Sequence, residues 1–171
     1  RRRLAELGRT ISEAMASARA ITRDLAPPVA IQRDLPMALQ SLALDMEARH
    51  GLMVRTQLCT ACSQITEATS VLLFTAAREL LMNVVKHACT QRAELCTQCG
   101  PDWVVLRVRD RGRGMKPDAM KTVTTGGGFG LFSIRERAEL LGGTLTVHSA
   151  PRRGTCTILR LPIAPGSCES T

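Results

Sequence analysis

RDRGRGMKPDAMKTVTTGGGFGL, residues Arg109–Leu131, is the most informative stretch of this chain. It holds six of the 13 glycines, in two clusters separated by a polar segment. Glycine lets a ligand approach the backbone closely, and bare N–H groups can then surround phosphate oxygens. Asp110 ends an apolar strand pattern and offers a carboxylate, which only accepts hydrogen bonds. The stretch therefore favours a nucleotide site, with two ordinary surface turns as the alternative.

Composition restricts the functions open to the chain. Its 171 residues suffice for one domain with a core. One Trp, three Phe and no Tyr leave little for the aromatic platforms that bind single-stranded nucleic acid. The net charge of +8 comes mostly from scattered arginines, so we expect no direct nucleic-acid binding; a phosphate-rich ligand, an acidic partner or an arginine-rich genome fits the charge. No run of 18 apolar residues occurs, so we expect no membrane contact.

Seven cysteines include two CxxC pairs, Cys59–Cys62 and Cys96–Cys99. Paired CxxC motifs are typical of zinc sites. Both pairs, however, fall at or within strand patterns, where residues three apart point to opposite faces. We therefore expect free thiols in a reducing compartment, and a zinc-binding interaction module remains an alternative.

An apolar seam predicts a long helix over residues 4–25. Its members follow the alternating spacing of a heptad repeat: Leu4, Leu7, Ile11, Ala14, Ala18, Ile21 and Leu25. The seam is narrower than the face that a globular helix usually buries, which favours pairing with another helix, such as one from a second subunit. Packing on its own domain is the alternative. Pro27 and Pro28 end this helix, because proline donates no backbone hydrogen bond.

A second helix is expected from Asp34, as N-cap, to His50, with Gly51 as C-cap. Its predicted apolar side consists of Met37, Leu39, Leu42, Leu44 and Met46. Residues 52–58 follow as a strand.

The strongest helix pattern covers residues 66–89 and carries one polar stripe. Glu79, Asn83 and Lys86 lie at i, i+4 and i+7, within about 60° of one another on an α-helical period. His87 borders the stripe. Asn is a poor residue for a helix interior, so Asn83 indicates a functional stripe. A solvated polar face is the alternative.

The remaining patterns predict a sheet. The expected strands are residues 92–99, 103–109, 144–149 and 155–161, with a helix at 131–141. The second of these strands delivers Asp110. The order of helices and strands predicts an α+β fold, a two-layer sandwich with helices on one face of a largely antiparallel sheet.

Three separated motifs together resemble the catalytic domain of sensor histidine kinases of two-component systems. Arg78–Ala88, RELLMNVVKHA, is similar to the N box of that family. Asp110–Met115, DRGRGM, resembles the first glycine box, and Gly126–Leu131, GGGFGL, resembles the second. The sequence LAPP at residues 25–28 and SIRER at 133–137 are similar to the nitrate-sensor-type subfamily. The resemblance covers nearly the whole chain.

The resemblance implies the Bergerat ATP-binding fold of the GHKL superfamily, which is also a two-layer α/β sandwich. It divides the chain into a helix of the dimerisation and phosphotransfer domain (1–28), the ATP-binding catalytic domain (29–164) and a disordered tail (165–171). It also implies a homodimer through helix 4–25 and the receiver domain of a response regulator as partner. The implied location is cytoplasmic, free or as part of a membrane-anchored sensor.

ATP and Mg²⁺ are the implied cofactors, and the family motifs assign residues around the adenine base. Asp110 would accept a hydrogen bond from the adenine amino group. Gly112 and Gly114 would let the backbone turn against the base, and Met115 and Thr155 complete this part of the implied site.

The phosphate end of the implied site takes residues from two motifs. Asn83 would ligate Mg²⁺ through its side-chain oxygen, and Glu79 would be the catalytic acid/base residue. Lys86 and His87 would face the phosphates. The second glycine box would present N–H groups at a helix N-terminus, through Gly126, Gly128, Phe129, Gly130 and Leu131. Residues 115–127 would form a mobile lid.

One departure concerns the phosphoacceptor histidine, which in this family lies on a first dimerisation helix. His50, His87 and His148 do not match it, and the chain begins at Arg1 without Met. Three explanations are open: a shortened chain, phosphorylation of another chain, or a degenerate kinase, against which the intact motifs argue. Another GHKL ATPase or a serine kinase of the anti-sigma-factor type is the alternative function. The Pro27–Pro28 junction and the short lid weigh against it.

Overall fold

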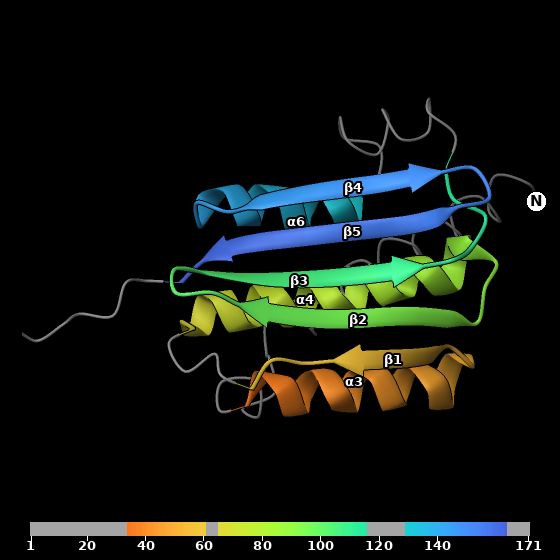
Figure 1. Cartoon of the computed structure of the whole chain (residues 1–171), viewed down its shortest axis with the longest axis horizontal. Coiled ribbons are helices and arrows are strands. Elements are labelled where there is room, and N and C mark those ends of the chain that lie inside the picture. Colours follow the sequence, from red (N-terminus) through yellow and green to blue (C-terminus); the bar gives the residue numbers. More distant parts are fainter. Residues whose placement is uncertain (1–33, 61–64, 116–128, 164–171) are drawn as a thin grey trace, which may run out of the picture.

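The computed structural model describes residues 34–60, 65–115 and 129–163. In this part of the chain, three longer helices lie on one side of a five-stranded sheet with the order β1-β2-β3-β5-β4 (Figure 1). The elements are α3 (Leu35–His50), β1 (Met53–Gln57), α4 (Glu67–Asn83), the π-helical turn η1 (Val84–Ala88), β2 (Arg92–Cys99), β3 (Trp103–Asp110), α6 (Phe129–Leu140), β4 (Thr144–Ala150) and β5 (Gly154–Pro162). The predicted α+β two-layer sandwich is confirmed.

The connections explain the strand directions. β1 pairs with β2 in parallel, because α4 and η1 carry the chain back across the sheet between them. The other three pairings are antiparallel, and the hairpins β2–β3 and β4–β5 are the two that the sequence predicts. Along β3, alternation buries Val104, Leu106 and Val108 in the core. Asp110 continues this buried series at the end of the strand.

Helix α4 is the central helix of the core. Its N-cap is Thr66, whose hydroxyl accepts a hydrogen bond from the Thr69 N–H at 3.2 Å. The span Glu67–Ala88 is long and apolar enough to cross a membrane by length and composition alone. Its buried side chains nevertheless belong to the core that packs against the sheet, including Leu73 and Leu81. The helix therefore has the burial of a core helix in a globular domain.

Helix α3 has the predicted ends but a different buried face. Asp34 accepts a hydrogen bond from the Met37 N–H at 3.0 Å, and Gly51 adopts φ = 65° at the C-cap. The prediction that Met37 and Leu44 face the core is wrong, since they are 65% and 59% exposed. Each follows a buried leucine by two positions, which is about 200° around a helix. The buried face is Leu35, Ala38, Leu39, Leu42, Ala43 and Met46.

The free-thiol expectation is wrong for Cys99. Cys99 is disulfide-bonded, whereas Cys59, Cys89, Cys96 and Cys156 are free. No group of three or more His, Cys, Asp or Glu residues suited to a metal ion occurs in the described ranges. As part of a disulfide, Cys99 offers no thiolate for zinc, and Cys62 of the other pair lies outside the described residues.

Several predictions fall outside the described residues. They are the heptad helix 4–25, the Pro27–Pro28 junction, the lid after Met115, the glycines Gly126 and Gly128, and the tail 165–171.

Candidate functional site

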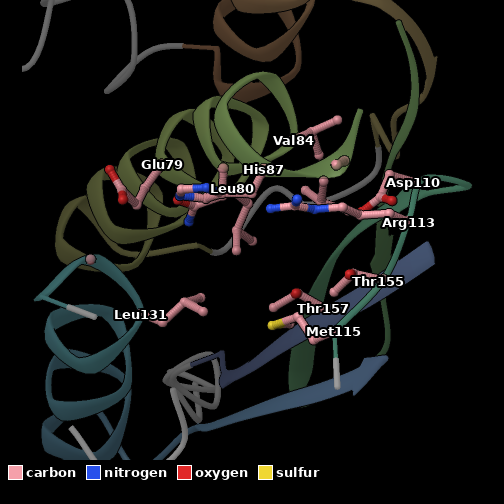
Figure 2. A pocket seen from close by; sticks show the side chains of 15 residues that line it. Glu79, Leu80, Val84, His87, Asp110, Arg113, Met115, Leu131, Thr155 and Thr157 are labelled. Carbon is pink, nitrogen blue, oxygen red and sulfur yellow. The ribbon is translucent and has the colours of Figure 1, made fainter. Parts of the chain in front are cut away.

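A cavity of about 340 Å³ lies where the helices meet one end of the sheet (Figure 2). Its lining comes from α4 with η1, from the end of β3 and the loop after it, from the start of α6, and from β5. Figure 2 shows Glu79 and Asp110 on opposite sides of the cavity, with Leu131 on the side of Glu79 and Thr155 on the side of Asp110. The volume and the mixed lining are typical of a small-molecule site.

The Asp110 side of the cavity is formed by neighbouring strands. Asp110 is only 5% exposed, and its carboxylate accepts a hydrogen bond from the Gly112 N–H at 2.7 Å. A carboxylate has about four acceptor positions, so it can accept a further bond from a ligand. Val108 lies opposite Thr157 on β5, and both line the same side. This side thus combines an apolar wall with a buried acceptor and a hydroxyl.

The loop after Asp110 is fixed between two other elements. The Arg113 N–H donates to the Ala88 carbonyl at 2.8 Å, and the Arg113 carbonyl accepts from the Arg152 N–H at 2.7 Å. A Cβ at Gly112 would overlap the Ala88 carbonyl, and one at Gly114 would overlap the Ala150 carbonyl. Gly112 is therefore required by packing against η1; it is buried outside the cavity lining. Gly114 lines the cavity and also has φ = 64°.

The structure brings most of the predicted polar stripe of the long helix to the cavity. Glu79, Asn83 and His87 line the cavity, whereas Lys86, which is exposed like His87, does not. The helix changes to π-helical winding after Asn83. Hydrogen bonds then close five residues apart instead of four, so each residue advances less around the axis. The wider turn brings the fourth residue after Asn83, and not the third, onto the stripe.

The start of α6 forms the wall beside Glu79. Gly130 and Leu131 line the cavity, and α6 begins at Phe129. The first N–H groups of a helix have no partner within the helix and point toward its N-terminal end, where an anion is favoured. The helix start thus places potential anion-binding groups beside a carboxylate and an amide.

Six residues that line the cavity have no counterpart among the residues predicted from the sequence. They are Leu80, Val84, Ala88, Val108, Arg113 and Thr157. For Val108 and Thr157 a signal exists, because each lies two residues from a predicted site residue on the same face of its strand. Leu80 and Val84 belong to the apolar face of α4 that also forms the core.

The two sides of the cavity carry different chemical groups. The buried carboxylate of Asp110 suits a ligand with a hydrogen-bond donor. At the other side, the Asn83 amide offers a hard oxygen of the kind that Mg²⁺ binds, and Mg²⁺ characteristically takes few protein ligands together with phosphate oxygens. The cavity therefore offers a buried acceptor at one end and, at the other, groups suited to an anion or a hard cation.

The sequences of known proteins also indicate a nucleotide-binding domain. Residues 68–165 match the family described as histidine kinase-, DNA gyrase B-, and HSP90-like ATPase. The chain is 30% identical over 146 residues to the oxygen sensor histidine kinase NreB of Staphylococcus carnosus, covering 85% of this chain and 41% of that protein. It is 32% identical over 145 residues to the sensor histidine kinase NarS of Mycobacterium tuberculosis, covering 85% and 33%. The chain thus spans less than half of the length of either relative.

Solved structures agree on the fold. The histidine kinase domain of a blue-light activated histidine kinase from Erythrobacter litoralis superposes with a TM-score of 0.65 at 22% identity, covering 77% of this chain and 62% of that one.

Proposed function

Because the chain belongs to the histidine kinase-, DNA gyrase B-, and HSP90-like ATPase family, as the ATP-binding catalytic domain of a sensor histidine kinase, we propose that it transfers the γ-phosphoryl group of ATP to a histidine. The acceptor histidine lies on a dimerisation helix, and the phosphoryl group then passes to a response regulator. The observation that carries this proposal is the cavity that joins Asp110, Asn83 and Glu79.

Asp110 selects the base. Its carboxylate accepts a hydrogen bond from the 6-amino group of adenine and repels the 6-oxygen that guanine carries at the same position. Burial strengthens both effects, because water competes little at a carboxylate that is 5% exposed. Val108 and Thr157, beside it, supply one apolar and one polar contact to the ring.

The other side of the cavity holds the phosphates and the reacting atoms. Asn83 is the residue that would hold Mg²⁺, which supplies charge neutralisation on the phosphates. His87 and the N–H groups at the start of α6 bind phosphate oxygens. Glu79 accepts the proton that the attacking imidazole loses as the new N–P bond forms and the bond to ADP breaks. Met115, Leu131 and Thr155 enclose the nucleotide, and Gly126, Gly128 and Phe129 complete the phosphate loop.

The partners are part of the same proposal. A homodimer through helix 4–25 is supported by the narrow heptad seam. The similarity to the sensor histidine kinases NreB and NarS supports a response regulator as the downstream partner. Because ATP is a cytoplasmic substrate, we place the domain in the cytoplasm.

The proposal is tested by Asp110→Asn. The amide still accepts from the Gly112 N–H, so the fold should survive, but the charged acceptor is lost. We expect ATP affinity with Mg²⁺, measured by calorimetry, to fall about 10- to 100-fold, which corresponds to one charge-assisted hydrogen bond. Preference for ATP over GTP should shrink, since the amide N–H can donate to guanine.

The matched control is Asp102→Asn, the same substitution at an exposed position in the β2–β3 turn. It should leave ATP affinity unchanged. If Asp110→Asn binds ATP as tightly as this control does, the adenine assignment is wrong.

A further inference from the structure

Gly130 and Glu79 are in close contact across two helices. A Cβ added to Gly130 would overlap three atoms of the Glu79 side chain, Oε1, Cδ and Cγ. Gly130 is the second residue of α6 and is not a position of positive φ. Its backbone conformation therefore does not require glycine. What requires glycine here is the space that the Glu79 carboxylate occupies.

The helix packing explains why the two residues meet. Gly130, Ile134 and Ala138 follow one another at four-residue spacing and so share one face of α6. Ile134 and Ala138 are buried in the core, where α6 packs against α4. Gly130 ends this face at the cavity, so the contact between the helices continues directly into the contact with Glu79.

We propose that Gly130 is a positioning residue for Glu79: the missing side chain leaves a slot at the start of α6 that sets where the Glu79 carboxylate lies relative to the reacting atoms. The inference rests on the proposed function, in which Glu79 accepts the proton. It differs from a phosphate-loop role for Gly130, which would act through ATP binding.

The atoms in contact predict which group moves when the slot is filled. All three belong to the outer part of a flexible side chain, whereas the overlaps at Gly112 and Gly114 are with backbone carbonyls. A methyl group at Gly130 should therefore displace Glu79 and leave the backbone in place. A misplacement of about 1 Å at a catalytic group can reduce a rate about 100-fold.

The test is Gly130→Ala, compared with Glu139→Ala, an alanine substitution at an exposed position of the same helix. Phosphoryl transfer to a histidine-bearing dimerisation helix supplied in trans is measured in single turnovers, and ATP affinity by calorimetry. We expect Gly130→Ala to slow transfer about 10- to 100-fold while ATP affinity changes less than about threefold. Glu139→Ala should change neither, and the melting temperatures of both variants should match the parent.

A double substitution separates the possible outcomes. In Glu79→Gln there is no base to displace, so adding Gly130→Ala should slow transfer less than about threefold further. An unchanged rate in Gly130→Ala, or a loss of ATP affinity in proportion to the rate, overturns the inference. If Glu79→Gln itself transfers as fast as the parent, the failure lies with the proposed role of Glu79, whatever Gly130→Ala does.

Discussion

Thr157 lines the cavity but belongs to none of the three sequence motifs. It is 4% exposed, lines the cavity, and lies opposite Val108 on the neighbouring strand. We predict that Thr157→Val, which keeps the shape and removes the hydroxyl, weakens ATP binding about fivefold, the effect of one neutral hydrogen bond. Calorimetric titration of the variant checks this. An unchanged affinity would mean that the hydroxyl does not contact the nucleotide.

At this scale, the residues that could be predicted are those whose position follows from a short-range pattern. Asp110 continues the alternation of β3, and Glu79 and Asn83 follow the α-helical period of α4. Thr157 obeys the same strand alternation, yet its place beside Val108 depends on the pairing of β3 with β5. These strands are separated in sequence by α6 and β4, and no local pattern specifies their pairing.

Among the elements, the π-helical turn η1 determines which basic residue reaches the site. It places His87 on the cavity wall and leaves Lys86 exposed outside it. We predict that His87→Ala lowers ATP affinity about 3- to 10-fold, whereas Lys86→Ala changes it less than about twofold, because His87 lines the cavity and Lys86 does not. Equilibrium binding at one fixed salt concentration measures both. A larger loss in Lys86→Ala would contradict the assigned winding.

The loop after β3 makes a second prediction at the scale of elements. A methyl group at Gly112 would meet the backbone carbonyl of Ala88, which cannot move without disturbing η1. Gly112→Ala should therefore destabilise the domain by about 1–3 kcal/mol and weaken ATP binding. Gly51→Ala is the comparison: it has a positive φ but nothing near its added Cβ, so it should cost about 1–2 kcal/mol and spare ATP binding.

Thermal unfolding and nucleotide titration of the two glycine variants separate the effect of steric overlap at Gly112 from the effect of an unfavourable backbone angle at Gly51. Equal effects of both substitutions on ATP affinity would exclude a specific role for the contact between Gly112 and η1.

Sequence patterns predict some features of the helices and not others. The ends of α3 were predictable, because Asp34 and Gly51 act through local hydrogen bonds and backbone angles. The π turn was not, since nothing in the residue pattern of Val84–Ala88 separates it from an α-helical continuation. The disulfide of Cys99 likewise depends on a tertiary neighbour that cysteine spacing does not reveal.

For the whole molecule, the described core supports a catalytic domain that folds without the N-terminal helix. Helix α3 begins with its own cap at Asp34, and Leu35 is already buried in the core with residues of α4 and the sheet. The apolar spacing of residues 4–25 is narrower than the face that a globular helix usually buries, and we predict from it a helix that pairs with a partner helix. Folding and self-association should therefore reside in different parts of the chain.

We predict that a chain of residues 29–171 unfolds cooperatively, binds ATP within about twofold of the affinity of residues 1–171, and does not self-associate. ATP at about 100 times its Kd should stabilise both chains by about 2.7 kcal/mol, since both carry the same cavity. Sedimentation equilibrium measures association, and thermal unfolding with and without ATP measures the linkage. Loss of cooperative unfolding would make residues 1–28 part of the catalytic fold, and a dimer that persists would place the interface elsewhere, because the deletion removes every position of the heptad seam.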